Sequence, residues 1–291
     1  MNYFWSALQA VLNGLLTGSL YALIGMGMAL IFGVMRIVNF AHGAFMMLGM
    51  YVVYVLYDRA GISPFYGFIA GAAVLFVLGF LVYRLLLQRI SGKSDFMQIL
   101  LTLGLALITI DGIQLIFGAD YHQVNLPILG ENVRFGRITL NAPWLIAFAI
   151  TLVVAVGMFL FVMKSRFGRA LRAIAQNPYA AELMGIDVKL VQAISFGMGL
   201  AAVGIAGGLL LPVFYLYPGV GDQFTLKAFV MVVLGGMGSV EGAAFAGLTL
   251  GVIENLTSLY WGNQWALTVD FILFLLVLSL RPSGLFGSQR V

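Results

Sequence analysis

The sequence predicts an all-α membrane protein, a polytopic helix bundle of eight or nine transmembrane segments. If there are eight, one further segment is re-entrant. Composition is the first observation behind this prediction. Of the 291 residues, 62% are hydrophobic and 9% are charged, and the mean hydropathy is +1.04. A soluble domain carries about 25% charged residues because its surface faces water, whereas the outside of a membrane bundle faces hydrocarbon. The composition therefore excludes an ordinary soluble domain.

The spacing of the apolar runs is the second observation. A helix needs about 20 apolar residues to cross a bilayer, and the chain offers runs of about this length between its charged residues. The 36 glycines fit such helices, because small residues let helix backbones approach closely in lipid. The segments expected to be helical are 8–32, 37–57, 60–83, 96–119, 142–163, 190–211, 224–237, 242–260 and 265–280.

Lysine and arginine gather in three places, and these clusters predict the orientation. Basic loops favour the cytoplasmic side of a membrane, and an even number of segments separates each cluster from the next. We therefore place all three in the cytoplasm and the loop 120–141 outside. The N-terminus is then outside with nine segments and inside with eight. The clusters are Arg84, Arg89 and Lys93; Lys164, Arg166, Arg169, Arg172 and Lys189; and Arg281 and Arg290.

The whole chain, residues 1–291, reads as a single transmembrane domain. Residues 1–35 contain no Lys or Arg, so we expect no cleaved signal peptide. In the outer loop, the uneven alternation over 133–140 and the enclosed Gly136 predict a small hairpin or ordered turn. Residues 40–46 and 224–230 resemble each other weakly, as the two halves of an inverted repeat would.

The segment 164–189 is too polar to cross the membrane and is rich in helix signals. It reads KSRFGRALRAIAQNPYAAELMGIDVK. Residues 170–176 favour a helix, Pro178 can open a second helix with Asn177 as its N-cap, and Gly185 can end that helix. Two interpretations remain open: a basic loop that only fixes the topology, or a docking element for a cytoplasmic partner.

Three stretches carry a resemblance to a known family. They are 33–45 (GVMRIVNFAHGAF) followed by 48–51, then 168–187, and then 234–242 (LGGMGSVEG). The chain resembles the permease subunits of bacterial branched-chain amino acid ABC importers, specifically the shorter, H-type of the two sibling permeases. The resemblance covers nearly the whole chain, and the stretches occur in the family's order.

The resemblance implies a role and a set of partners. The expected role is to move leucine, isoleucine and valine across the bacterial inner membrane, with urea or short amides as an open alternative. The expected partners are the sibling permease, two cytoplasmic P-loop ATPase subunits, a periplasmic amino-acid-binding protein and the lipid bilayer, and no nucleic acid. We expect no catalytic residue, cofactor or metal in this chain. Gly92, Lys93 and Ser94 resemble the end of a P-loop, but such a loop also needs a glycine at position 87, and this chain has Leu87 there. We therefore expect partner subunits to bind the ATP.

The resemblance also points to individual residues. In the segment 164–189, contact with the ATPase is expected from Arg166, Gly168, Arg169, Arg172, Ala180, Ala181, Glu182, Gly185 and Asp187. Candidates for the transport pathway are Asn39, His42, Gly43, Gly235, Gly236, Gly238 and Glu254. For Asn39 and His42, two interpretations stand. Either Asn39 caps a half-helix whose amides face a carboxylate, or both side chains satisfy broken backbone inside the bundle.

Three acids lie within apolar segments: Asp111, Glu254 and Asp270. Ionisable groups in a bilayer are costly and are often functional. They could relay protons in a self-contained, ion-coupled secondary amino acid carrier, which is the alternative to the importer. In an ATP-driven importer they would be structural pairs or helix-end residues, and Lys227 is a candidate partner. The sequence favours the structural interpretation.

The orientation gives the first testable prediction. Cysteines placed at Ser91 and Ser288 should be shielded from an impermeant thiol reagent in intact cells, and a cysteine at Asn132 should be labelled. A cysteine at Asn2 distinguishes the two topologies: it should be labelled if there are nine segments and shielded if there are eight. Labelling at Ser91 would contradict the orientation.

Overall fold

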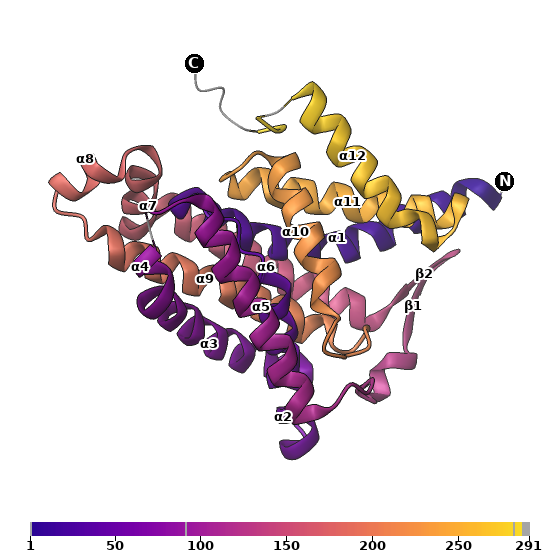
Figure 1. Cartoon of the computed structure of the whole chain (residues 1–291). Coiled ribbons are helices and arrows are strands. Elements are labelled where there is room, and N and C mark those ends of the chain that lie inside the picture. The colour runs from indigo at the N-terminus through magenta and orange to yellow at the C-terminus, as the bar shows by residue number, and fades with distance from the viewer. Residues whose placement is uncertain (1, 91, 282, 287–291) are drawn as a thin grey trace.

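The computed structural model describes residues 2–90, 92–281 and 283–286, so Ser91 and Ser288 lie outside the described residues. The chain folds into a helical bundle with one small hairpin (Figure 1). The long elements are α1 (Asn2–Met35), α2 (His42–Ala60), α3 (Pro64–Val82), α5 (Asp95–Phe117), α6 (Ala142–Lys164), α9 (Val188–Leu210), α10 (Gly221–Gly235), α11 (Val240–Trp261) and α12 (Ala266–Leu280). Shorter pieces are α4 (Gln88–Ile90), α7 (Arg166–Gln176) and α8 (Pro178–Leu183).

Seven helical spans among the described residues are long and apolar enough to cross a membrane. This confirms an all-α polytopic membrane protein. The two other long helices, α2 and α10, are not long and apolar enough to be counted among these spans. Helix α10 has 15 residues and is therefore about 23 Å long. The seven spans are Tyr3–Met35, Pro64–Ile90, Asp95–Phe117, Ala142–Lys164, Val188–Leu210, Val240–Trp261 and Asn263–Leu280.

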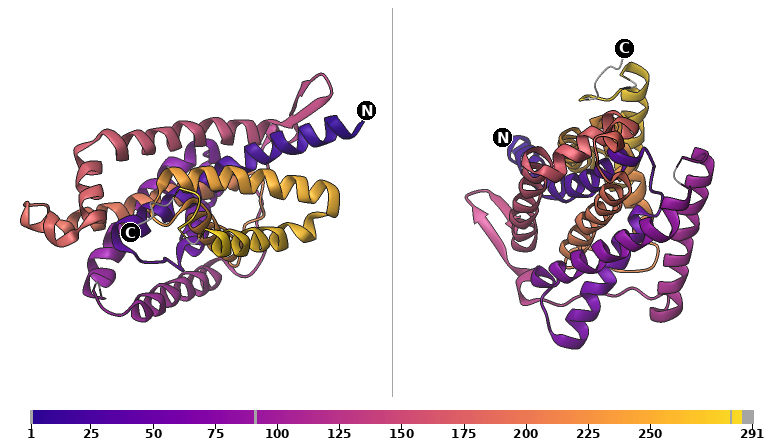
Figure 2. Two further views of the ribbon diagram at one scale, coloured as in Figure 1. Left: turned by 90° about the horizontal axis from the view of Figure 1, so that it is seen from above. Right: turned by 90° about the vertical axis from the view of Figure 1, so that its left-hand side faces the viewer.

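Helix α1 forms the centre of the bundle, with α9 and α11 packed along it (Figure 2). Glycines make this approach possible. A Cβ atom on Gly18 would lie 2.9 Å from the Cα atom of Leu248, and one on Gly27 would lie 2.7 Å from the carbonyl oxygen of Gly199. Larger side chains at these positions would force the helices apart, so the glycine content of the sequence serves helix packing.

The two short helices α2 and α10 meet at their N-termini. A Cβ atom on Gly43 would collide with the carbonyl oxygen of Gly221, and the amide of Gly43 donates a hydrogen bond of 2.9 Å to Oγ1 of Thr225. Each helix follows a stretch without helix, 36–41 before α2 and 211–220 before α10. The two segments with weak mutual resemblance, 40–46 and 224–230, therefore lie close together at the two helix starts.

The outer loop contains the predicted hairpin. Strands β1 (Asn132–Phe135) and β2 (Ile138–Asn141) pair antiparallel, with Val133 opposite Leu140. Gly136 takes a φ of +63° in the turn, a conformation that favours glycine. A bridge between His122 and Leu216 ties the same loop to the segment before α10.

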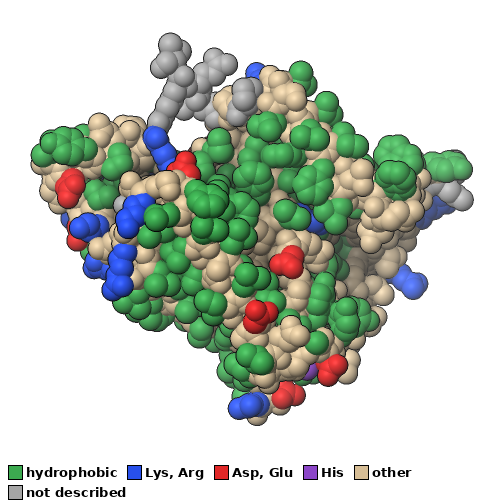
Figure 3. All heavy atoms as spheres, in the orientation of Figure 1, with side chains coloured by type: hydrophobic (Ala, Val, Ile, Leu, Met, Phe, Trp, Pro, Cys, Tyr) green, Lys and Arg blue, Asp and Glu red, His purple; other side chains and the backbone are tan. Residues whose placement is uncertain are grey.

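One sequence expectation about the first basic cluster is wrong. Arg84 and Arg89 do not lie in a loop, because the helix continues past Val82 through a π-helical turn, η1 (Tyr83–Leu87), into α4. Tyr83 and Leu87 are buried, so packing against the bundle supports the helix past Val82. Lysine and arginine still gather at the end of the molecule that carries α4, α7 and α8 (Figure 3).

Candidate functional site

In the segment 164–189, which we call the coupling segment, a side chain caps the start of each helix. Oγ of Ser165 accepts a hydrogen bond of 2.9 Å from the amide of Gly168 at the start of α7. Oδ1 of Asn177 accepts one of 3.1 Å from Ala180 at the start of α8, as the sequence predicted. Asp187 caps α9 in the same way. These caps satisfy amides that a helix start leaves unpaired.

Gly185 ends α8 in the expected left-handed conformation, with a φ of +83°. The amide of Gly185 donates to the carbonyl of Glu182, and the amide of Ile186 donates to the carbonyl of Ala181. This is the Schellman arrangement, in which a glycine closes the helix at no steric cost. A branched side chain at Gly185 would be strained even though the surrounding space is open.

A close contact fixes the corner between α6 and α7. A Cβ atom on Gly168 would collide with the carbonyl group of Val162 near the end of α6. The guanidinium of Arg172 donates to the carbonyls of Val162 and Met163, at 2.5 and 3.2 Å. Arg172 thereby satisfies two carbonyls at the C-terminus of α6 and binds α7 to the membrane helix.

Two apolar residues of the coupling segment are not available to a partner. Leu171 and Ile174 are buried against this chain, because α7 packs on α1 and α9 as well as on α6. Tyr179, Leu183 and Met184 are exposed on and just after α8. The expected ATPase contacts divide accordingly. Arg166, Arg169, Ala180, Glu182, Gly185 and Asp187 are exposed, Arg172 is half-buried, and Gly168 and Ala181 are buried.

Asn39 and His42 are fully buried at the start of α2. Oδ1 of Asn39 accepts from the amide of Ala41 at 3.1 Å, and the N-cap position itself is occupied by Ala41. Nε2 of His42 lies 3.1 Å from the carbonyl oxygen of Ile24 in α1. The expectation that Asn39 caps the helix is therefore wrong: Asn39 lies two residues before the N-cap, Ala41, and braces the non-helical stretch that precedes α2.

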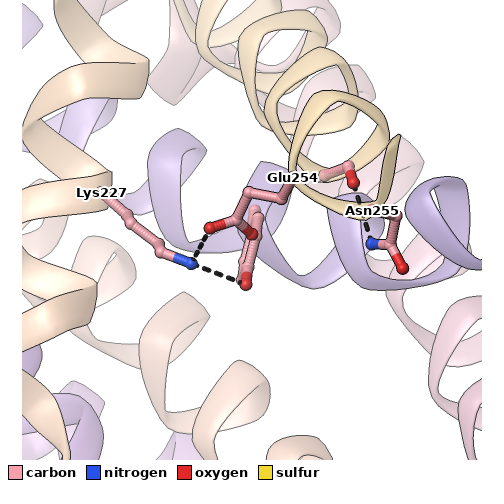
Figure 4. Close-up of polar contacts among 5 residues, drawn as sticks. Lys227, Glu254 and Asn255 are labelled. Carbon is pink, nitrogen blue, oxygen red and sulfur yellow. Dashed lines mark hydrogen bonds and ion pairs between the residues drawn. The ribbon is translucent and has the colours of Figure 1, made fainter. Parts of the chain in front are cut away.

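Lys227 of α10 forms an ion pair with Glu254 of α11 (Figure 4). Lys227 also donates a hydrogen bond of 2.9 Å to the hydroxyl of Tyr21, and its ammonium lies 4.4 Å from the centre of the Tyr21 ring. All three side chains are buried. The pairing of Lys227 with an intramembrane acid is confirmed, and it removes the cost of an isolated charge in the bilayer.

Asp270 of α12 joins this cluster. Its carboxyl group is buried and lies beside the pair of Glu254 and Lys227. No feature of the sequence predicted a role for Tyr21 or for Thr225. A hydroxyl is common in apolar helices, and only the contact across helices distinguishes these two.

The glycines of 234–242 serve both as a helix break and as a packing seam. Gly236 and Gly238 have positive φ values of 99° and 89° and separate α10 from α11. Gly235 lies against the backbone of Gly242, and Gly238 lies against Gly33 near the end of α1. The described residues bring together no group of three or more His, Asp or Glu side chains that could hold a metal ion.

Comparison with known proteins identifies the class. Residues 10–279 match the family model described as branched-chain amino acid transport system / permease component. The chain therefore belongs to this family, whose members are transport permeases and not enzymes. No solved structure matches.

Individual relatives are similar over nearly their full length. The chain is 31% identical to the high-affinity branched-chain amino acid transport system permease protein BraD of Pseudomonas aeruginosa, covering 98% of this chain and 97% of the relative. It is also 31% identical to LivH of Escherichia coli, covering 98% and 96%. A probable branched-chain amino acid transport permease protein LivM of Methanocaldococcus jannaschii is 26% identical over 74% of this chain and 67% of the relative.

The buried ion pair gives a prediction about stability. The change Lys227→Met leaves the carboxylate of Glu254 buried without its partner, so it should lower the free energy of unfolding by about 3–5 kcal/mol. Lys227→Met combined with Glu254→Gln should restore most of the loss, because no charge is then stranded. Thermal unfolding in detergent measures both, with Lys189→Met at an exposed site as the control. Equal stability of the single and double variants would contradict the pairing.

Proposed function

We propose that the chain forms one half of the membrane pathway of an ATP-driven importer of branched-chain amino acids in the bacterial inner membrane. The full-length similarity to permeases named for that transport carries the proposal. The other half would be a sibling permease, and the energy would come from two cytoplasmic P-loop ATPase subunits that bind ATP. A periplasmic binding protein would deliver the amino acid near the loop 120–141.

For the membrane topology we propose nine crossings with the N-terminus outside. Nε2 of Gln192, near the start of α9, bonds to the carbonyl of Val34 near the end of α1, and Tyr83 at the end of α3 bonds to Gln192. These three helix ends therefore lie on one side. Since α3 starts on the opposite side, 36–41 and α2 together must carry the chain across.

The same argument applies to α10. It lies between the far end of α9 and Gly238, which packs on Gly33 near the end of α1. Helix α10 with its preceding stretch therefore completes a crossing in the opposite direction to α2. Helices α2 and α10 are thus each preceded by non-helical backbone inside the bundle, as in the discontinuous helices of many transporters. The surrounding protein shelters this non-helical backbone from lipid.

The mechanism that we propose begins at the coupling segment. The exposed face of α8, with Tyr179, Leu183 and Met184, would lie in a groove of an ATPase subunit. Movement of that subunit would pass through the capped turns to α7, and then through the Arg172 contacts to α6 and through packing to α1 and α9. The chain itself makes and breaks no covalent bond.

Around the centre of α1, the polar groups support a structural role. The amide of Gly43 already donates to Thr225, and the charge of Glu254 is already paired with Lys227. We propose that Asn39, His42 and Glu254 hold the interrupted helices together, and that the glycines 235, 236 and 238 let α10 and α11 shift against the end of α1.

Transport in proteoliposomes tests the function. The chain, co-purified with its sibling and ATPases, should take up leucine when ATP and binding protein are supplied, and a proton or sodium gradient alone should drive no uptake. Asp270→Asn should retain ATP-driven uptake, because no proton step passes through it. Gradient-driven uptake without ATPases would instead establish the ion-coupled carrier.

The coupling segment gives a sharper prediction. Gly185→Val should leave the protein inserted in the membrane but reduce ATPase association and leucine uptake several-fold, because valine is disfavoured at a φ of +83° by about 1–2 kcal/mol. Glu182→Lys should act in the same direction if the carboxylate meets a basic groove.

Gly136→Val is the matched control, since Gly136 also has a positive φ but lies in the outer hairpin. It should leave ATPase association unchanged in a co-purification assay. Normal association and uptake for both Gly185→Val and Glu182→Lys would mean that the coupling segment only fixes topology.

A further inference from the structure

Helix α5 stands at the edge of the bundle. Its main packing is against α2, and it lies apart from α12 in both views of Figure 2. Three of its 23 residues are buried: Gln98, Thr102 and Ile113. A long apolar face of α5 is therefore turned away from this chain, and it includes Leu100, Leu107 and Ile108.

The glycines of α5 differ from those of the central helices. A Cβ atom on Gly104 or Gly112 would meet nothing within 4 Å, whereas the glycines of α1, α9 and α11 lie against neighbouring backbones. Glycine weakens a helix unless a neighbour uses the close approach that it allows. Within the described part of the chain, nothing packs against Gly104 or Gly112. Gly157 on α6 is equally open, but α6 has no acidic residue.

Asp111 lies on the same exposed face, one turn beyond Leu107 and Ile108. It is six residues before Phe117, which places it about 9 Å from that end of the helix and about 24 Å from the other end. A carboxylate at this depth would face hydrocarbon if nothing covered it, at a cost of several kcal/mol. Aspartate has too short a side chain to reach the surface as lysine or arginine does.

From these three observations we infer that the α5 face centred on Asp111 packs against a second, non-identical permease subunit, which presents a basic or hydrogen-bond-donating side chain to Asp111. The inference rests on the proposed function, which calls for a sibling permease. It adds the surface by which this chain meets the sibling, and the chemistry of that contact.

A second copy of this chain fits the face less well. Two copies in one membrane share their orientation, so a symmetric contact through α5 would place the two Asp111 side chains at the same depth and near each other. Like charges at close range in low dielectric repel strongly. A sibling with the same fold but a different residue at that depth removes the repulsion and neutralises the acid.

Site-specific photocrosslinking tests the inference in membranes that hold the complete transporter. A benzophenone amino acid at Ile108, which is 72% exposed on α5, should form an adduct with the sibling permease. The same probe at Val153, which is 73% exposed on α6, is the control and should form none. An adduct of twice 31.5 kDa that contains only this chain would overturn the inference. Absence of a protein adduct at Ile108 would overturn it as well.

A charge reversal provides a second measurement. Asp111→Lys should lower the amount of sibling that co-purifies by about tenfold or more, since it opposes two cations in the bilayer, and Asp111→Asn should have a smaller effect because the amide still accepts a hydrogen bond. Asp58→Lys changes an exposed acid at the far end of α2 and should leave the yield of sibling unchanged.

ATP-driven leucine uptake, measured with the parent chain in the same membranes, separates the two proposals. Normal uptake together with no adduct at Ile108, or with unchanged co-purification of Asp111→Lys, would reject the α5 interface alone. Loss of uptake in the parent transporter would reject the proposed function.

Discussion

The close approach of α1 to α9 and α11 is the contact on which the rest of the structure depends. Helices in lipid gain nothing from hiding apolar surface, so their association relies on tight packing. Gly18 and Gly27 bring the backbones of the neighbouring helices to within van der Waals contact of α1. Helix α1 is thereby enclosed, and the other elements are arranged around it.

Because α1 is enclosed, it can hold polar groups that lipid would reject. The carbonyl of Ile24 accepts from His42, and the hydroxyl of Tyr21, three residues earlier on α1, accepts from Lys227. These two positions are one turn apart, so the start of α2 and the ion pair between α10 and α11 are joined through the same part of α1. The interrupted helices are sheltered where their backbone is least regular.

The end of the molecule that carries α7 and α8 is organised by a different principle, the capping of helix termini. Ser165, Asn177 and Asp187 each satisfy an amide, and Arg172 satisfies the last carbonyls of α6. Such bonds restrict bending of the coupling segment, which the proposed transmission of movement from α8 to α6 requires. The periphery contrasts with this, since most residues of α5 and α12 are not buried in this chain.

Composition and apolar spacing determined the membrane bundle, its helices to within a few residues in most cases, and the capped helices of 164–189, because these features depend on neighbours in sequence. The sequence also gave the family through its three motifs. Tertiary structure alone decided that Leu171 and Ile174 are buried, that Tyr21 joins Lys227, that α2 and α10 meet, and that Asp111 faces outward. An apolar helix in lipid carries too little amphipathic signal to reveal which face meets protein and which meets lipid, so these contacts emerge only when the helices are packed.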